Sequence, residues 1–348
     1  MGHLNSYESF KSKKSVERKS RIKSKKNKVL DDFIVYKHDK YAVVIGVSYN
    51  YADVLDDEKV IKARLRKDIN YPCNKILFPG DKVVLDDGII KKLIKRSSLL
   101  SRVKKDGTRI NDKGDVKNFA ANVDIAVIVA SAYEPPLHPK FIDRYLMVLE
   151  NSNIPSIICI NKCDLMTNKE KEIIDVYRSL DILVVKTSTY TGEGIDDLKK
   201  HLKGRQAIFV GNSGVGKSSL INKLMDFDEI KTGNVSLNSK RGRHTTTTSK
   251  YYVWDVNSSI IDTPGIRSLD VSSFKPEEIQ NYFKEFDKNM CKYKDCMHYK
   301  EPIRSCVIKQ RVLKGLINKE RYKSYLRIMD DLFNENKCDD ILKEIMNG

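Results

Sequence analysis

No apolar run in the sequence approaches the roughly 20 residues that a membrane-spanning helix needs. The first residues do not combine a basic segment with an apolar core, so we expect no secretory leader. Cysteine is scarce: the 348 residues hold 7, an odd number scattered along the chain, which argues against a disulfide framework. These absences favour a cytoplasmic protein, and the length suggests two or three domains.

Positive charge, by contrast, is plentiful and concentrated near the amino terminus. The formal net charge is +17, and lysine and arginine dominate residues 11–28, where Glu17 is the single acid. Such a block cannot bury a core, so residues 1–34 are predicted to form a disordered basic arm that neutralises phosphates. A solubilising or organelle-targeting tail is the alternative, although Glu8 and Glu17 argue against a transit peptide.

Residues 211–218 complete the pattern G-x-x-x-x-G-K-S of nucleoside triphosphatases. The apolar run Ala207–Val210 before it is typical of a buried parallel strand, and Ser219–Met225 after it is typical of a helix start. This context argues against a chance glycine-rich turn, because the glycines would let backbone N–H groups surround phosphates at a helix N-terminus. Lys217 is expected to reach the β- and γ-phosphates and Ser218 to ligate Mg²⁺. The predicted nucleotide contacts are Gly211, Asn212, Ser213, Gly214, Val215, Gly216, Lys217, Ser218 and Ser219.

A second loop indicates which base is bound. Residues 161–164 match N-K-x-D, the guanine-reading element of GTPases, and follow the apolar run Ile157–Ile160. The Asp164 carboxylate can accept from guanine N1–H and the N2 amino group, whereas adenine would leave it unpaired. Asn161 is expected to tie this loop to the phosphate loop, and Lys162 to cover the base. The predicted base contacts in this loop are Asn161, Lys162, Cys163 and Asp164.

Two more elements complete the set. Ser188 and Thr189 resemble the S-A-K element, in which a backbone N–H meets guanine O6, although Thr189 stands where alanine is usual. Residues 262–265 match D-x-x-G, in which Asp262 holds Mg²⁺ through water and the Gly265 N–H contacts the γ-phosphate. Four matched elements at strand ends predict a GTPase. Its predicted magnesium site comprises Ser218, Thr246 and Asp262.

The order of these elements is unusual. GTPases ordinarily begin with the phosphate loop and end with N-K-x-D and S-A-K, whereas here the last two elements come first. A parallel sheet whose chain ends lie close together tolerates such a circular permutation. One consequence is that D-x-x-G leads directly into the segment after residue 280. A movement driven by the γ-phosphate could therefore reach the C-terminal region.

The region before the GTPase motifs has short strand-like runs at roughly ten-residue spacing. They are Tyr41–Val47, Lys59–Arg66, Gly80–Leu85 and Gly88–Ile94, separated by turn signals. This pattern predicts a small barrel, and basic strand faces favour the five-stranded oligonucleotide-binding (OB) type. A barrel that serves only as a packing module is the alternative.

Beyond residue 285, four possible metal ligands fall within sixteen residues, spaced C-x₄-C-x-H-x₇-C. Three thiolates and one imidazole complete a tetrahedral structural zinc site, and the metal would stabilise a segment with little core of its own. Chance clustering of buried thiols is the alternative. The predicted ligands are Cys291, Cys296, His298 and Cys306. A basic face that lies against RNA, or is merely solvated, is predicted for the following residues: Lys309, Arg311, Lys314, Lys319, Arg321, Lys323 and Arg327.

Taken together, these motifs resemble the ribosome small-subunit-dependent GTPase A family over about residues 41–326. The most specific parts are the permuted order, G-R-H-T-T-T at 242–247 and C-K-Y-K-D-C-M-H at 291–298. The resemblance implies an OB-type barrel, a permuted α/β P-loop GTPase domain and a C-terminal α-helical zinc-binding domain. It also implies GTP hydrolysis stimulated by the small ribosomal subunit and its rRNA, during late maturation of that subunit, in bacterial cytoplasm or a related organelle. We expect a monomer without membrane association.

The sequence departs from the family at the metal ligands. The family usually has about five residues between His and the last Cys, whereas seven separate His298 from Cys306, so Cys338 is an alternative fourth ligand. The predicted domains are residues 1–34 (arm), 35–102 (barrel), 103–117 (linker), 118–284 (GTPase) and 285–348 (zinc-binding).

The residue that positions water for hydrolysis is also unusual. Many GTPases place Gln after D-x-x-G, but Ile266 stands here and cannot hydrogen-bond to water. His244, in the first switch beside Thr246, is the predicted catalytic residue. Two readings compete with a subunit-stimulated enzyme: an RNA-binding factor controlled by GTP or GDP, and a permuted GTPase of the large subunit. The latter lacks the barrel and the zinc cluster.

Overall fold

The computed structural model describes residues 33–36, 39–69, 72–104, 115–225, 250–255, 257–262, 271–272, 274–286 and 291–347. The chain separates into two compact units, one ending at Ser97 and the other beginning at Ser98. Each unit is described by itself. Within the described ranges, no helix is both long and apolar enough to cross a membrane.

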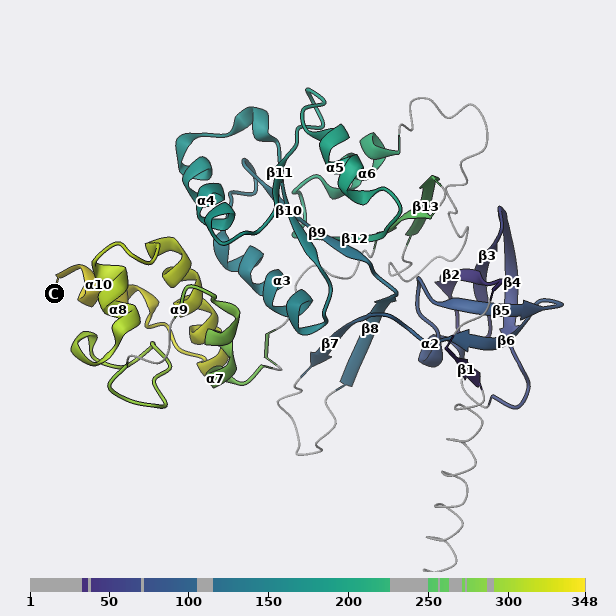
Figure 1. The fold of residues 1–348 in the computed structure, drawn as a ribbon, viewed down its shortest axis with the longest axis horizontal. Helices are drawn as coiled ribbons and strands as arrows, with labels where there is room; N and C mark the ends of the chain where they lie inside the picture. The colour runs from purple at the N-terminus through teal and green to yellow at the C-terminus, as the bar shows by residue number, and fades with distance from the viewer. Residues whose placement is uncertain are drawn as a thin grey trace, which may run out of the picture. The chain divides into compact units, whose positions relative to one another are not determined.

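The first unit is a closed barrel of five strands (Figure 1). β2 pairs with β3, β3 with β4, β4 with β6, β6 with β5, and β5 returns to β2; the short β1 (Ile34–Val35) adds to β6. The predicted five-stranded barrel is confirmed, and β3 is a strand that the sequence analysis did not identify. The barrel strands are β2 (Ala42–Val47), β3 (Ala52–Asp56), β4 (Lys59–Leu65), β5 (Lys82–Asp86) and β6 (Ile89–Ile94).

Alternation along the strands builds the barrel core. On β3, Ala52 and Val54 are fully buried and face Phe33 and Ala63 of the same apolar cluster. On β4, by contrast, basic residues on either side of Ala63 are exposed. A short helix, α2 (Cys73–Ile76), contributes a buried cysteine to the core. The basic strand face that the sequence predicts is therefore present on β4.

The second unit contains a six-stranded sheet in the order β11-β10-β9-β12-β14-β13. All neighbouring strands are parallel except β13 and β14, which form an antiparallel pair. The carboxyl ends of the five parallel strands therefore share one edge of the sheet. The strands are β9 (Ile125–Ser131), β10 (Ser156–Asn161), β11 (Val184–Lys186), β12 (Gln206–Val210), β13 (Lys250–Asp255) and β14 (Ser258–Asp262).

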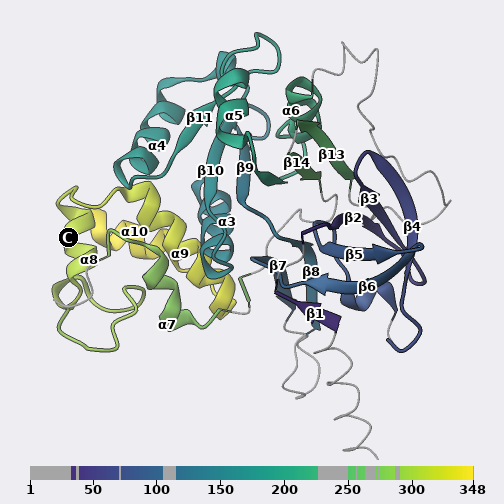
Figure 2. The same cartoon turned by 45° about the vertical axis from the view of Figure 1, so that its right-hand side comes forward.

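Helices cover both faces of this sheet (Figures 1 and 2). Successive residues of a strand point to opposite faces, so Ile157 and Cys159 of β10 pack with α5 and α6, while Ile158 and Ile160 pack with α3 and α4. The apolar strand runs in the sequence are explained by this burial on both sides. The helices are α3 (Pro139–Asn151), α4 (Asn168–Ser179), α5 (Ile195–Leu202) and α6 (Lys217–Leu224).

A two-stranded antiparallel ribbon precedes the sheet. It consists of β7 (Leu99–Lys104) and β8 (Asp115–Ala121), and its register pairs Leu99 with Ala121. These strands occupy both ends of the segment 103–117 that the sequence predicts to be a linker. The predicted domain boundaries otherwise stay predictions.

The C-terminal region is helical and packs on the sheet domain, because α9 lies against α3 (Figure 2). Tyr322, Tyr325 and Leu326 on α9 are fully buried. Sheet domain and C-terminal region therefore belong to one compact unit. The elements are α7 (Pro276–Ile279), η3 (Gln280–Tyr282), η5 (Ile303–Ser305), α8 (Val307–Leu313), α9 (Lys319–Phe333) and α10 (Cys338–Asn347).

Candidate nucleotide and metal sites

The predicted phosphate loop joins the end of β12 to the start of α6. Two of its glycines are required by close contacts as well as by backbone conformation. A Cβ on Gly211 would lie 2.2 Å from the Val129 carbonyl oxygen, and a Cβ on Gly216 would lie 2.3 Å from Asn161 Nδ2. Both residues have positive φ, at +145° for Gly211 and +90° for Gly216. The sequence therefore folds this loop tightly against the neighbouring strand ends.

The loop offers both charge and open surface. Lys217 Nζ donates to the carbonyl oxygens of Gly211 and Asn212, at 2.7 Å each, which holds the ammonium group over the loop. Ser213, Gly214, Ser218 and Ser219 are exposed, Asn212 is half-buried, and Val215 is buried. An anion can therefore reach the loop backbone and the start of α6.

The N-K-x-D loop lies beside the phosphate loop, as the sequence predicts. Asn161 is buried, and its Nδ2 donates to the Val215 carbonyl oxygen at 3.0 Å. Lys162 then adopts a left-handed conformation with φ of 58°, and the 3₁₀ turn η1 (Cys163–Leu165) follows. The turn leaves the Asp164 side chain exposed. An exposed carboxylate at a rigid strand end is what base recognition requires.

Cys163 is held between the two base-reading loops. Its backbone N–H donates to the Thr187 carbonyl oxygen at 3.0 Å. Burial raises the pKa of the Cys163 thiol to about 11, and a hydrogen bond to Glu193 adds to that shift. The thiol is therefore neutral at physiological pH, and the backbone N–H of this residue links the two base-reading loops.

The S-A-K-like loop is held by its own hydrogen bonds. Ser188 is fully buried, its Oγ accepts from the Thr191 N–H at 3.1 Å, and its own N–H donates to the Glu193 carbonyl oxygen at 3.0 Å. A Cβ on Gly194 would lie 1.8 Å from the Lys186 carbonyl oxygen, so only glycine closes this loop. Thr189, between these contacts, is half-buried.

The loop after β9 contributes a contact that the sequence analysis missed. Lys162 Nζ donates to the Glu134 carbonyl oxygen, and Pro135 Cδ lies 3.6 Å from the position of a Cβ on Gly214. The only local signal is the pair Pro135-Pro136 after a buried strand, which predicts a turn but not its partners. This loop therefore joins the base-reading lysine to the phosphate loop.

Asp262 ends β14, and its strand pairing places it opposite Phe209, two residues before Gly211. The D-x-x-G aspartate thus lies at the same sheet edge as the phosphate loop. Gly265, His244, Thr246 and Ile266 lie outside the described residues. The described guanine-nucleotide elements all follow carboxyl ends of parallel strands, where open α/β sheets bind their ligands.

The four predicted metal ligands lie together in the C-terminal region. His298 Nδ1 is 3.6 Å from Cys291 Sγ, 3.3 Å from Cys296 Sγ and 3.4 Å from Cys306 Sγ. All four ligand atoms lie within 4.8 Å of one another. In a tetrahedral zinc site, with Zn–S of about 2.3 Å and Zn–N of about 2.0 Å, the nitrogen and a sulfur stand roughly 3.5 Å apart. The donor set and its spacing therefore fit zinc.

Burial keeps the thiols of this cluster protonated until a metal binds. Cys296, His298 and Cys306 are at most 4% exposed. Burial raises the pKa of the Cys306 thiol to about 11 and also raises that of Cys296. A metal would have to displace the thiol protons, as thiolate sites do. Cys338, the alternative ligand, lies outside the cluster, and its Sγ is 3.8 Å from the Lys323 carbonyl oxygen.

The long segment between His298 and Cys306 is anchored rather than loose. The Glu301 carboxylate accepts from the N–H groups of Met297 and Tyr299, at 2.8 Å each, on either side of His298. Tyr322 on α9 donates to the His298 carbonyl oxygen at 2.7 Å. These bonds fix the backbone of the ligand, so seven intervening residues still close the cluster.

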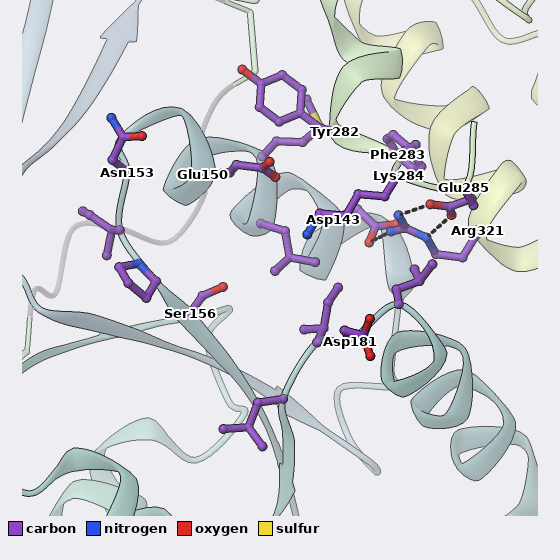
Figure 3. A pocket seen from close by; sticks show the side chains of 17 residues that line it. Asp143, Glu150, Asn153, Ser156, Asp181, Tyr282, Phe283, Lys284, Glu285 and Arg321 are labelled. Carbon is purple, nitrogen blue, oxygen red and sulfur yellow. Dashed lines mark hydrogen bonds and ion pairs between the residues drawn. The ribbon is translucent and has the colours of Figure 1, made fainter. Parts of the chain in front are cut away.

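A buried arginine joins the C-terminal region to the sheet domain (Figure 3). The Arg321 guanidinium donates to Asp143 Oδ1 on α3 and, at 2.8 Å, to Glu285 Oε1. It lies 4.4 Å from the centroid of the Phe283 ring, and Tyr177 donates to Asp143 at 2.8 Å. A cavity of 530 Å³ opens beside this network, bounded by residues that precede β10 and β11. The network therefore lies at the sheet edge opposite the nucleotide elements.

The predicted basic face is wrong for two of its residues, which are buried and cannot form part of an exposed surface. Lys309 is fully buried, and Arg321 is only 4% exposed because it forms the ion pairs described above. Their helical spacing resembles that of surface lysines, and the sequence carries no local sign of their partners. Lys314 and Lys319 are exposed as predicted.

Comparison with known proteins agrees with this geometry. The sequence profile of the RsgA GTPase family matches residues 93–272. A protein of Thermotoga petrophila named "Small ribosomal subunit biogenesis GTPase RsgA" is 33% identical over 306 residues, 85% of this chain and 97% of that protein. A protein of the same name from Sodalis glossinidius is 37% identical over 312 residues, 84% of this chain and 86% of that protein.

Solved structures extend the similarity to the fold. YjeQ from Thermotoga maritima superposes with a TM-score of 0.65 at 30% identity, covering 85% of this chain and 99% of that one. YloQ, described as a circularly permuted GTPase, gives a TM-score of 0.61 at 26% identity, covering 86% and 96%. These similarities agree with the nucleotide motifs, their permuted order, the barrel and the Cys₃His cluster. The chain is a GTP hydrolase that belongs to the RsgA GTPase family.

Proposed function

We propose that this GTPase binds the small ribosomal subunit, assists its late maturation, and leaves it when GTP has been hydrolysed. The observation that carries the proposal is the combination of a guanine-nucleotide site with relatives named for small-subunit biogenesis over 85% of the chain. The subunit and its rRNA are the partners, and GTP is the substrate.

The nucleotide would be held at the sheet edge by the loops described above. Backbone N–H groups of residues 211–216 and the Lys217 ammonium would bind the phosphates, and Asp164 would accept from guanine. Asn161 supports this role because its amide joins the two loops at 3.0 Å. In the loop of Ser188 and Thr189, the Thr189 N–H would meet guanine O6, because the Ser188 N–H already donates to the Glu193 carbonyl oxygen.

Mg²⁺ would be held by Ser218, Thr246 and, through water, Asp262. Bound there, Mg²⁺ would neutralise negative charge on the phosphates of the nucleotide. His244 would orient the attacking water, because Ile266 has no group that can do so. Gly265 would contact the γ-phosphate through its N–H. Intrinsic turnover should therefore be slow until the small subunit stimulates it.

The barrel would contact RNA through paired aromatic and cationic side chains. Lys82 Nζ lies 4.8 Å from the Tyr41 ring centroid, and Lys95 Nζ lies 4.7 Å from that of Tyr36. The Tyr36 side chain is 81% exposed and that of Tyr49 is 65% exposed. Exposed rings stack on bases and ammonium groups neutralise phosphates, which is how barrels of this type bind single strands.

The test is co-sedimentation with purified small and large ribosomal subunits, in GDP and in a non-hydrolysable GTP analogue. We expect binding to the small subunit alone, and tighter binding with the analogue than with GDP. Equal binding in both nucleotides would contradict release by hydrolysis. Binding without any stimulation of GTP turnover would favour an RNA-binding factor whose hydrolysis is incidental.

A further inference from the structure

Lys309 is a buried cation whose partner is not evident from hydrogen bonds. It lies on α8, three residues after Cys306, and its side chain is fully buried. Its Nζ is shielded from solvent and has no hydrogen-bond partner in the part of the chain that the structure describes. An unpaired buried ammonium is strongly unfavourable, so some nearby negative charge must compensate for it.

Four groups that are anionic when ionised interact electrostatically with the Lys309 ammonium: Glu344, Cys306, Glu301 and Cys296. Glu301 is already engaged by the N–H groups of Met297 and Tyr299. Glu344 lies on α10 with its side chain exposed, so water screens it. The two cysteines are buried, and as metal-bound thiolates they would carry negative charge that water does not screen.

The charge of the metal site supplies the remaining argument. Zn²⁺ with three thiolates and one neutral imidazole carries a net charge of about −1, and no more ligands can be added to a closed tetrahedral site. A buried charge of −1 needs a cation as much as Lys309 needs an anion. We propose that the Lys309 ammonium balances the net negative charge of the zinc–thiolate centre and so helps to retain the metal. Lys309 is thus a positioning residue of the Cys₃His site. This inference rests on the zinc site and goes beyond its four ligands.

The decisive variant is Lys309→Met, which keeps an unbranched stem of similar length and removes only the charge. The full zinc-loaded chain is mixed with a chromogenic chelator, and the zinc affinity is obtained by competition. We expect a 10- to 100-fold loss of affinity, as for other residues that support metal ligands. Lys309→Arg should recover most of it. If Lys309→Met retained zinc like the wild type, the proposal would be overturned.

Two further measurements separate charge from packing. Glu344→Gln is the matched control: it should leave zinc affinity unchanged, and a loss equal to that of Lys309→Met would make Glu344 the partner instead. In the Co²⁺-substituted chain, Lys309→Met should move the thiolate-to-metal charge-transfer absorption to lower energy, because removal of a nearby cation raises the sulfur lone pairs. Lost packing alone would not shift that band. An unshifted band would overturn the proposal.

Should Lys309→Met fail to fold, Lys309→Gln replaces it, since glutamine keeps a hydrogen-bond donor without the charge. Wild-type zinc affinity in that variant would again overturn the role of the charge. The zinc content of the wild type shows whether a negative result concerns the metal site itself or only the role of Lys309. If the wild-type chain contains no zinc, both the metal site and this inference are wrong. If the wild type contains zinc and its variants bind zinc with the same affinity, only the role of Lys309 is wrong.

Discussion

The nucleotide site and the metal site of this chain are built on opposite principles. The nucleotide loops keep Asp164, Ser213, Gly214 and Ser218 exposed, and much of their binding capacity lies in the backbone. The Cys₃His site buries three of its four ligand side chains and brings all four ligand atoms within 4.8 Å of one another. The first arrangement suits a ligand that must enter and leave in each cycle. The second suits an ion that stays and stabilises the fold.

Metal removal should give the largest effect. Zinc-finger peptides derive on the order of 10 kcal/mol from a structural zinc ion, and in this cluster four ligand atoms lie within 4.8 Å of one another. We therefore expect Cys296→Ser to lose the zinc and to lower the free energy of unfolding of residues 291–347 by several kcal/mol. Metal analysis and hydrogen exchange over that segment provide the measurement.

Cys338→Ser is the matched control, because Cys338 is equally buried but lies outside the cluster. It should keep one zinc per chain. A Cys296→Ser protein that stays protected from exchange after residue 291 would show that the cluster does not stabilise this region.

The second effect concerns the junction between the two regions. Arg321→Ala would leave Asp143 buried without its ion pair, and breaking such a pair typically costs about 3–5 kcal/mol of unfolding free energy. Arg178→Ala, which breaks an exposed pair 3.7 Å from Asp175, should cost no more than about 0.5 kcal/mol. Chemical denaturation of both variants measures the difference, and equal small losses would show that the junction is not held by Arg321.

The third effect concerns recognition of the base in the nucleotide site. Asp164→Asn should weaken GTP binding by about 2–4 kcal/mol, through loss of a charged acceptor for two guanine donors. It should also shift preference toward xanthine nucleotides, whose O2 accepts where guanine N2 donates. Titration with GTP and XTP gives both quantities, and unchanged guanine selectivity would mean that another residue reads the base.

The smallest effect should come from the link between the two nucleotide loops. Asn161→Ala removes two buried hydrogen bonds: from Nδ2 to the Val215 carbonyl oxygen at 3.0 Å, and from Thr187 Oγ1 to Asn161 Oδ1 at 3.3 Å. We expect GTP affinity to fall by about 1 kcal/mol with little change in base selectivity. A change of selectivity as large as that of Asp164→Asn would mean that Asn161 itself contacts the base.

The features that could be predicted from the sequence are those that depend on short local patterns. The phosphate loop, N-K-x-D and the Cys₃His spacing are short patterns in which chemistry fixes the residue types, so local reading identified them and the barrel strand runs. Partners distant in sequence left no such sign. Arg321 meets Asp143 across 178 positions, and a buried lysine such as Lys309 has the same spacing as an exposed one.

Weak local patterns account for the other differences. β3 (Ala52–Asp56) is short and ends in acidic residues, so its two buried positions did not stand out. β7 and β8 each run into the charged segment 103–117 that resembles a linker, and their mutual pairing shows that both ends of this segment are strands. The role of Glu134 depends on a backbone carbonyl, for which no side-chain pattern exists.

The most direct test of the proposed function is single-turnover GTP hydrolysis by the full chain, with and without purified small ribosomal subunits. Since Ile266 cannot position water, we expect small subunits to raise the rate at least about tenfold, whereas large subunits should not. His244→Ala should lose most of this stimulation while its GTP affinity and subunit binding stay near wild type. A wild-type rate that small subunits leave unchanged would contradict the account.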